Sequence, residues 1–175
     1  MNMKKFGLVL MCILVLTGCT SKSTKTGSKK INSYDNKFQI TVPATWTTSK
    51  SKGDLNSAAN IEVQDSEKQK YMIAITEAKE DLAMDFEKYQ ETIFNQNEEN
   101  YNTKFEDIKD ININGKSCKY VDFKTTQETA NIYMRIYAIE TDHYYSQILI
   151  WTTYSQKDDV QKEFDNIISS FKEVK

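Results

Sequence analysis

The segment Asp110-Ile-Asn112-Ile-Asn114-Gly115 is the first candidate for a site that could do chemistry. Oxygen donors at every second position, followed by glycine, are typical of the first half of an EF-hand calcium loop. The twelfth position of such a loop is a bidentate Glu, but here it is Val121. The same residues fit a strand that enters an Asn-Gly hairpin turn, because both turn residues tolerate positive φ. We therefore expect a hairpin and keep calcium at Asp110, Asn112 and Asn114 as the weaker alternative.

Aromatic side chains around the only arginine form the second candidate, a binding face. Tyrosine, tryptophan and arginine are enriched at the energetic centres of protein interfaces, so these residues could line a groove for a peptide or a sugar. The alternative is a second core layer beneath a helix, with the tyrosine hydroxyls reaching solvent at its rim. The candidate face comprises Tyr133, Arg135, Tyr137, Tyr145, Trp151 and Tyr154.

Residue patterns that would indicate an enzyme are missing from the sequence. His143 is the only histidine, and it lies between two predicted strands, where a turn residue is expected. Metal sites that hydrolyse substrates need several ligands at defined spacing. Neither Gly-x-Ser-x-Gly nor His-Glu-x-x-His occurs, and a chain with five glycines has little material for a phosphate loop. We therefore expect a non-catalytic protein that needs no cofactor.

The N-terminus resembles a bacterial lipoprotein signal. Two lysines precede eleven apolar or small residues from Phe6 to Leu16, a stretch shorter than the roughly 20 residues that span a membrane. Leu16-Thr-Gly-Cys19 has the form of a lipobox, after which cleavage leaves a lipidated cysteine. We expect residues 1–18 to be a signal peptide and Cys19 to anchor the protein by lipid to the extracytoplasmic face of the cell membrane. The alternative is an ordinary secretory signal with an incidental cysteine.

A basic tether is expected between the lipid and the domain. Residues 20–30 contain four lysines and no acidic or apolar residue, so they cannot build a core. We assign residues 19–33 to the lipidated cysteine and tether, and residues 34–175 to the domain. From Ile31 onward, 17 basic residues face 25 acidic ones, a net charge of −8. This distribution suits an anionic membrane surface and argues against nucleic acid as a partner.

Hydrophobic patterning predicts an α+β domain with two long amphipathic helices. Strands are expected at residues 38–42, 61–64, 71–76, 108–113, 116–126, 130–140 and 144–153. One helix should follow an Asp85 cap and run through Tyr101, and the other should follow a Ser155 cap and end near Phe171. Cys118, the one cysteine outside the N-terminal segment, lies in a predicted strand, and we expect it to be buried.

Strands 130–140 and 144–153 carry apolar residues on both faces. A sheet covered on one side only would alternate apolar with polar residues. We therefore expect an α/β/α sandwich on a mainly antiparallel sheet.

The order of these elements resembles the PsbP-like family, whose fold is shared by the photosystem II extrinsic protein and a Ran-binding nuclear import factor. The resemblance rests on Tyr34-Asp-Asn-Lys-Phe38-Gln-Ile-Thr-Val-Pro43 followed by Trp46, on Ile113-Asn-Gly115, on Tyr144-Tyr145 with Trp151, and on Phe164 with Ile168-Ser-Ser-Phe171-Lys. Bacterial members of this family include many small lipoproteins, so the resemblance implies a binding or accessory module with a protein partner. No ligand residue of the photosystem protein has a matching position. A small-ligand or metal-binding lipoprotein is the alternative.

The sequence is rich in lysine, asparagine and isoleucine and has a single arginine. This bias suggests a low-GC Gram-positive source, in which the domain would face the cell wall.

Overall fold

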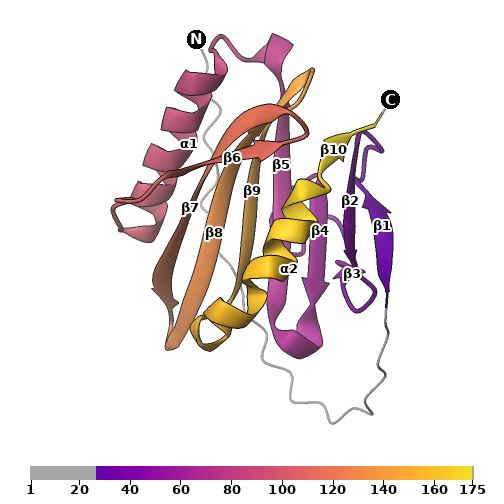
Figure 1. Cartoon of the computed structure of the whole chain (residues 1–175), viewed down its shortest axis with the longest axis vertical. Helices are drawn as coiled ribbons and strands as arrows, with labels where there is room; N and C mark the ends of the chain where they lie inside the picture. The colour runs from indigo at the N-terminus through magenta and orange to yellow at the C-terminus, as the bar shows by residue number, and fades with distance from the viewer. Residues whose placement is uncertain (1–26, 175) are drawn as a thin grey trace.

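Seven antiparallel strands form the main sheet of the computed structural model, which describes residues 27–174 (Figure 1). Their order across the sheet is β3-β4-β5-β9-β8-β7-β6, and every neighbouring pair is antiparallel. The strands are β3 (Thr47–Thr48), β4 (Ile61–Asp65), β5 (Lys70–Ala78), β6 (Lys109–Ile113), β7 (Lys116–Gln127), β8 (Ala130–Glu140) and β9 (Tyr144–Thr153). Strands β6 to β9 follow one another across the sheet as an antiparallel meander.

A second sheet of three strands lies beside the first, in the order β1-β2-β10. It contains β1 (Ser28–Asn32), β2 (Phe38–Pro43) and β10 (Lys172–Glu173). β1 was predicted to be tether, and that prediction is wrong: Ser28 to Asn32 pair with β2 in register. Only Ile31 of β1 is buried, so the strand has no apolar pattern that would have predicted it. Backbone pairing with β2 orders it instead.

Two helices cover opposite faces of the main sheet, which confirms the α/β/α sandwich (Figure 1). α1 (Phe86–Tyr101) buries Tyr89, Ile93 and Phe94 on one face, and α2 (Lys157–Ser169) buries an apolar stripe on the other. The alternation along β8 and β9 supplies both layers, because successive side chains on a strand point to opposite faces. The α2 stripe consists of Val160, Phe164, Ile167 and Ile168.

Only one of the two predicted helix caps is confirmed. The Asp85 side chain accepts a hydrogen bond from the Lys88 N–H, as expected for an N-cap. Ser155 instead lies within η3 (Tyr154–Gln156), a 3₁₀ turn that precedes α2, and its hydroxyl lies 3.2 Å from the Thr153 hydroxyl. The Ser155 prediction is wrong because this turn separates the residue from the first turn of the helix.

Two further short turns are η1 (Ser66–Lys68), between β4 and β5, and η2 (Lys79–Asp81), between β5 and α1. No helix within residues 27–174 is long and apolar enough to cross a membrane. The predicted signal peptide, Cys19 and most of the tether lie outside the described residues.

Candidate functional site

The predicted aromatic face is divided between the two sides of the sheet. Tyr133, Arg135 and Tyr137 of β8 lie on the α2 face, whereas Tyr145 and Trp151 of β9 lie on the α1 face. Strand register causes the division: Arg135 is paired with Ile150, so the odd-numbered residues of β8 share a face with the even-numbered residues of β9. The prediction of one continuous face is therefore wrong, and the alternative of core layers beneath helices is correct for these five residues.

Arg135 lies at the centre of a buried polar network beneath α2. Its guanidinium donates Nε–H to Asp122 Oδ1 (2.9 Å) and Nη1–H to Asp165 Oδ1 (2.6 Å) and to the Tyr137 hydroxyl (3.1 Å). Nη2 donates to the Tyr133 hydroxyl (3.0 Å) and to Gln161 Oε1. A guanidinium has five N–H groups, and all five are engaged. The side chain therefore has no donor left for a ligand.

Electrostatics inside this network favour the ion pair. Burial by itself raises the pKa of Asp122, but the hydrogen bond from Tyr133 and the charge of Arg135 lower it by more, so the pKa lies below its usual value. Burial and the hydrogen bond to Asp122 raise the pKa of Tyr133 to about 12. The network joins β7, β8 and α2, and its role is to hold the helix on the sheet.

The remaining member of the predicted face is Tyr154, which lies in η3 and is 37 % exposed. The ammonium groups of Lys124 and Lys157 lie 5.0 Å and 5.9 Å from the centre of its ring. Cations at these distances are attracted to the negative face of the ring. Tyr154 is thus the one residue of the predicted face with substantial exposed surface.

The candidate calcium segment forms the predicted hairpin. Asn114 and Gly115 occupy the turn between β6 and β7 with φ of +53° and +83°. The Asn112 side chain accepts a hydrogen bond from the Gly115 N–H, and the Asn114 amide donates to the Phe171 carbonyl. These side chains bond to the backbone and do not converge on one point. Among residues 27–174, no three His, Cys, Asp or Glu side chains are grouped as a metal site requires.

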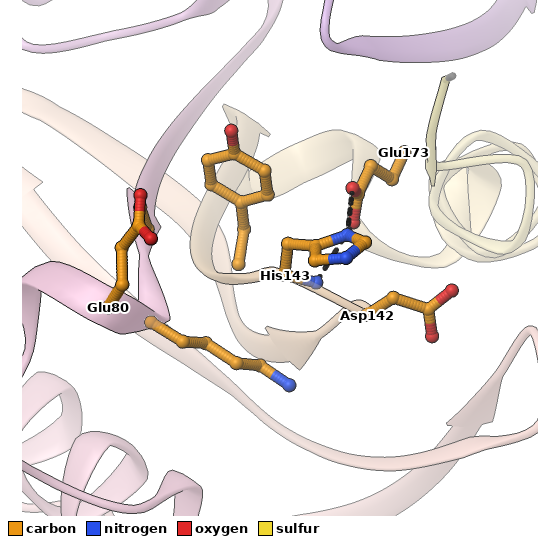
Figure 2. A pocket seen from close by; sticks show the side chains of 7 residues that line it. Glu80, Asp142, His143 and Glu173 are labelled. Atoms are coloured by element: carbon orange, nitrogen blue, oxygen red, sulfur yellow. Dashed lines mark hydrogen bonds and ion pairs between the residues drawn. The ribbon is translucent and has the colours of Figure 1, made fainter.

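His143 lines a surface pocket of about 440 Å³ at one end of the main sheet. Its Nδ1 lies 2.7 Å from Glu173 Oε1, and its backbone N–H donates to Glu173 Oε2 (3.2 Å). Figure 2 shows the Glu173 carboxylate directed at the imidazole, while Glu80 and Asp142 extend to either side. Burial raises the pKa of Glu173, but hydrogen bonds from His143 outweigh this, so the pKa lies below its usual value. The pair joins the β8–β9 turn to β10.

A second pocket of about 550 Å³ lies between α2 and the β1–β2 hairpin. Glu163 lines it but already accepts from Trp46 Nε1 (2.7 Å) and Lys70 Nζ (2.6 Å). The N–H of Thr41 in β2 is engaged as well, because it donates to the Ser170 hydroxyl (2.8 Å), which itself donates to the Ile167 carbonyl (2.6 Å). Asp159, Lys162 and Asn166 of α2 also line this groove.

No known sequence family matches this chain, and a search of curated protein sequences also finds no match. Solved structures do match it. Cyanobacterial PsbP (CyanoP) from Synechocystis sp. PCC 6803 is 11% identical, with a TM-score of 0.58 over 89% of this chain and 97% of its own. The Saccharomyces cerevisiae Ran-binding protein Mog1p is also 11% identical, with a TM-score of 0.58 over 83% and 95%. The domain has the PsbP/Mog1-like fold.

A third structure with the PsbP/Mog1-like fold is LpqN, involved in cell envelope biogenesis of Mycobacterium tuberculosis. It is 9% identical, with a TM-score of 0.52 over 85% of this chain and 91% of its own. Identities this low establish the fold and carry no residue roles. The predicted PsbP-like architecture is thus confirmed.

Sequence reasoning missed most of the buried charged residues. Glu62 is 1% exposed, and its carboxylate accepts the N–H groups of Gly53, Leu55 and Asn56 and the hydroxyl of Tyr34. No local pattern marked Glu62, because a charge between Ile61 and Val63 fits the alternation of a half-buried strand, in which it would face solvent. The partners of Arg135, Glu163 and His143 come from distant segments, and no local pattern marks them.

Proposed function

We propose that this protein is a membrane-anchored extracytoplasmic lipoprotein whose domain serves as a non-catalytic protein-interaction or accessory module. The observation that carries the proposal is the Leu16-Thr-Gly-Cys19 lipobox behind a basic and apolar leader. Two acyl chains on Cys19 give stable anchoring, whereas one chain is marginal. Only eight residues, 20–27, separate Cys19 from β1, and a fully extended chain of this length reaches roughly 30 Å. The domain would therefore stay close to the membrane.

The interior chemistry of the domain supports a binding role over a catalytic one. Arg135 uses all of its donors within the fold, and the Glu62 carboxylate accepts four hydrogen bonds from its own chain. A catalytic acid, base or nucleophile must instead reach a reacting atom from a pocket. These buried charged groups face structural partners, so the surface is where function would lie.

Lipid attachment is tested by replacing Cys19 with alanine and following the protein in fractionated cells grown with radiolabelled palmitate. The proposal expects the parent protein to be labelled and membrane-bound, and Cys19→Ala to be unlabelled and unprocessed. A Cys118→Ala variant is the matched control and should retain the label. Equal labelling of the parent and Cys19→Ala would contradict the proposed anchor.

A small-ligand-binding lipoprotein is the second candidate, and the pocket at His143 is the observation that favours it. Lys79, Glu80, Asp142 and Glu173 also line this pocket, so charges of both signs surround a space of about 440 Å³. A ligand that binds only the native state raises the melting temperature by mass action. A thermal-shift screen of amino acids, sugars and divalent metals tests this candidate, with His143→Ala as the control that should abolish any shift.

A further inference from the structure

The C-terminal half of β7 forms an open edge of the main sheet. β7 has twelve residues and is paired with β8 from Lys119 to Gln127, but β6 has five residues and is paired with β7 only from Lys116 to Tyr120. Figure 1 shows β6 beside one end of β7. The other end of β7 has β8 on its inner side and no described strand on its outer side. Within residues 27–174, the stretch from Asp122 to Thr126 therefore has a strand on one side alone.

Backbone groups at this edge point away from the sheet. In a hairpin with a two-residue turn, the residues that flank the turn form a hydrogen-bonded pair, and such pairs recur at every second position. Gln127 and Ala130 flank the β7–β8 turn, so odd-numbered residues of β7 bond to β8. The N–H and C=O groups of Asp122, Lys124 and Thr126 consequently face outward. Within residues 27–174 no other strand or loop accepts or donates to these backbone groups.

Exposed apolar side chains flank the same edge. Ile108 is 42% exposed and directly precedes Lys109, the residue of β6 that is paired with Tyr120 where the pairing stops. On the α2 face, Tyr154 is 37% exposed and lies beside Lys124. Only one other large apolar side chain in the described residues is as exposed as these two. The segment before Ile108 packs on the α1 face, where the centre of the Phe105 ring lies 4.9 Å from the centre of the Phe123 ring.

The charge at the edge disfavours symmetric pairing of two copies centred on Lys124. Antiparallel pairing of two copies, centred on the open stretch, would place Lys124 beside the same residue of the other copy, and like charges directly opposite are destabilising. A register shifted to place Asp122 opposite Lys124 would run Thr126 into β6 at Tyr120. Lys124 contacts the Tyr154 ring and has no acidic partner among residues 27–174.

We propose that the open edge of β7 is a docking site for an extended segment of another protein, which adds as a strand and carries an acidic side chain beside Lys124. Strand addition supplies affinity through main-chain hydrogen bonds and specificity through alternate side chains. On the α1 face, apolar side chains of the added strand would meet Phe123 and Phe105. The inference rests on the proposed function and assigns its binding surface.

The test uses the mature chain from residue 19 with Cys19→Ala, labelled with ¹⁵N, and two synthetic peptides. One peptide alternates valine with glutamate, and its matched control alternates valine with lysine. We expect the glutamate peptide to shift the amides of Asp122, Lys124 and Thr126 and to slow their hydrogen exchange, with an affinity about two- to fivefold above that of the lysine peptide. The amides of Phe123 and Thr125, already bonded to β8, should change their exchange least.

Two variants separate the edge from general folding. Thr126→Pro removes an outward N–H, so it should keep the fold and abolish peptide binding, because an edge strand tolerates proline where its N–H faces solvent. Thr125→Pro removes an N–H that bonds to β8 and should lower the melting temperature. Lys124→Glu should reverse the preference between the two peptides.

Absence of amide shifts at millimolar glutamate peptide, or shifts confined to another surface, would overturn the proposal. If the protein forms dimers without peptide and Thr126→Pro abolishes them, the occupant of the edge is a second copy of this chain, and the proposed occupant is wrong. Failure of this proposal is distinct from failure of the proposed function. A partner crosslinked in cells through another surface would support the protein-interaction role and would contradict only the assignment of the β7 edge as the binding surface.

Discussion

Replacing Arg135 with methionine removes the centre of the buried network and leaves its partners in place. The side chain is 4% exposed, and methionine fills a similar unbranched volume. The change removes the hydrogen bonds that Arg135 donates beneath α2. The groups that lose this donor are the Asp122 carboxylate, the Tyr133 and Tyr137 hydroxyls and the Gln161 side-chain oxygen. We expect the main effect to be on the free energy of unfolding.

The expected loss is about 3–5 kcal/mol, the usual consequence of removing one partner of a buried ion pair. Asp122 dominates this loss, because its side chain is 17% exposed and bonded to the guanidinium at 2.8–2.9 Å. Asp165 contributes little, since its side chain is 55% exposed and water can replace the lost contact. In a double-mutant cycle, Arg135→Met with Asp122→Asn should cost less than the sum of the single changes, because the buried charge that lost Arg135 is gone and only the exposed Lys109 pair is given up.

The loss should also depend on pH. The pKa of Asp122 lies below its usual value in the folded parent, so its stabilising contribution is complete above the unfolded pKa, about 3.9, and is lost as pH falls through the lower folded pKa. Without the Arg135 charge, the folded pKa rises. The stability difference between parent and Arg135→Met should therefore be largest near neutral pH and shrink below about pH 5.

Urea unfolding at pH 7 and pH 4, followed by circular dichroism, measures both effects. Lys88→Met is the control, because its exposed ion pair with Glu91 should contribute less than about 0.5 kcal/mol. A loss below about 1 kcal/mol for Arg135→Met, or a loss independent of pH, would refute the assignment of Arg135 as the structural centre of the α2 interface.

The remaining predictions concern four other positions. Gly115→Ala should destabilise by about 1 kcal/mol in urea unfolding, because its φ of +83° disfavours a side chain although the space is open; an unchanged midpoint would contradict this. Cys118 should resist iodoacetamide in the native protein, since it is fully buried and burial raises the pKa of the thiol, and should react completely in guanidinium; rapid native labelling would contradict burial. Glu62→Gln should cost about 1–3 kcal/mol and speed amide exchange first at Gly53, Leu55 and Asn56, whose N–H groups the carboxylate accepts; slow exchange there would contradict the role. Glu173→Gln should make the stability measured by calorimetry less sensitive to acid. The pKa of Glu173 is lowered, so the parent loses stabilisation as pH falls through that pKa, whereas the glutamine amide does not titrate. Identical pH profiles would contradict this.

Local patterns predicted the elements whose cause is local. The Asn114-Gly115 pair tolerates positive φ, and it forms the turn where the sequence places it. Asp85 caps α1 because its side chain needs only the backbone three residues away. Both faces of β8 and β9 carry apolar side chains, which predicted that both faces of the sheet are buried. α1 buries one face and α2 buries the other.

Relations between distant segments could not be predicted in the same way. Whether Tyr133 and Trp151 share a face depends on the register of β8 against β9, and a pairing shifted by one residue would reverse the answer. Asp165 lies 30 residues from Arg135, and Glu173 lies 30 residues from His143, so no spacing rule joins them. β1 was missed because pairing with β2 orders it with a single buried side chain.

The central claim is that a lipid anchor holds a protein-binding domain at the membrane, and crosslinking in intact cells tests it most directly. The lipidated protein would carry a photoreactive residue at Thr126, on the open edge, or at Glu91, an exposed position on α1, with Cys19→Ala as the anchoring control. We expect one protein to be crosslinked from Thr126 through an extended acidic segment, to be absent from Glu91 and to be much reduced in Cys19→Ala. Recovery of the bait alone from both positions, with Cys19→Ala still membrane-bound, would contradict it.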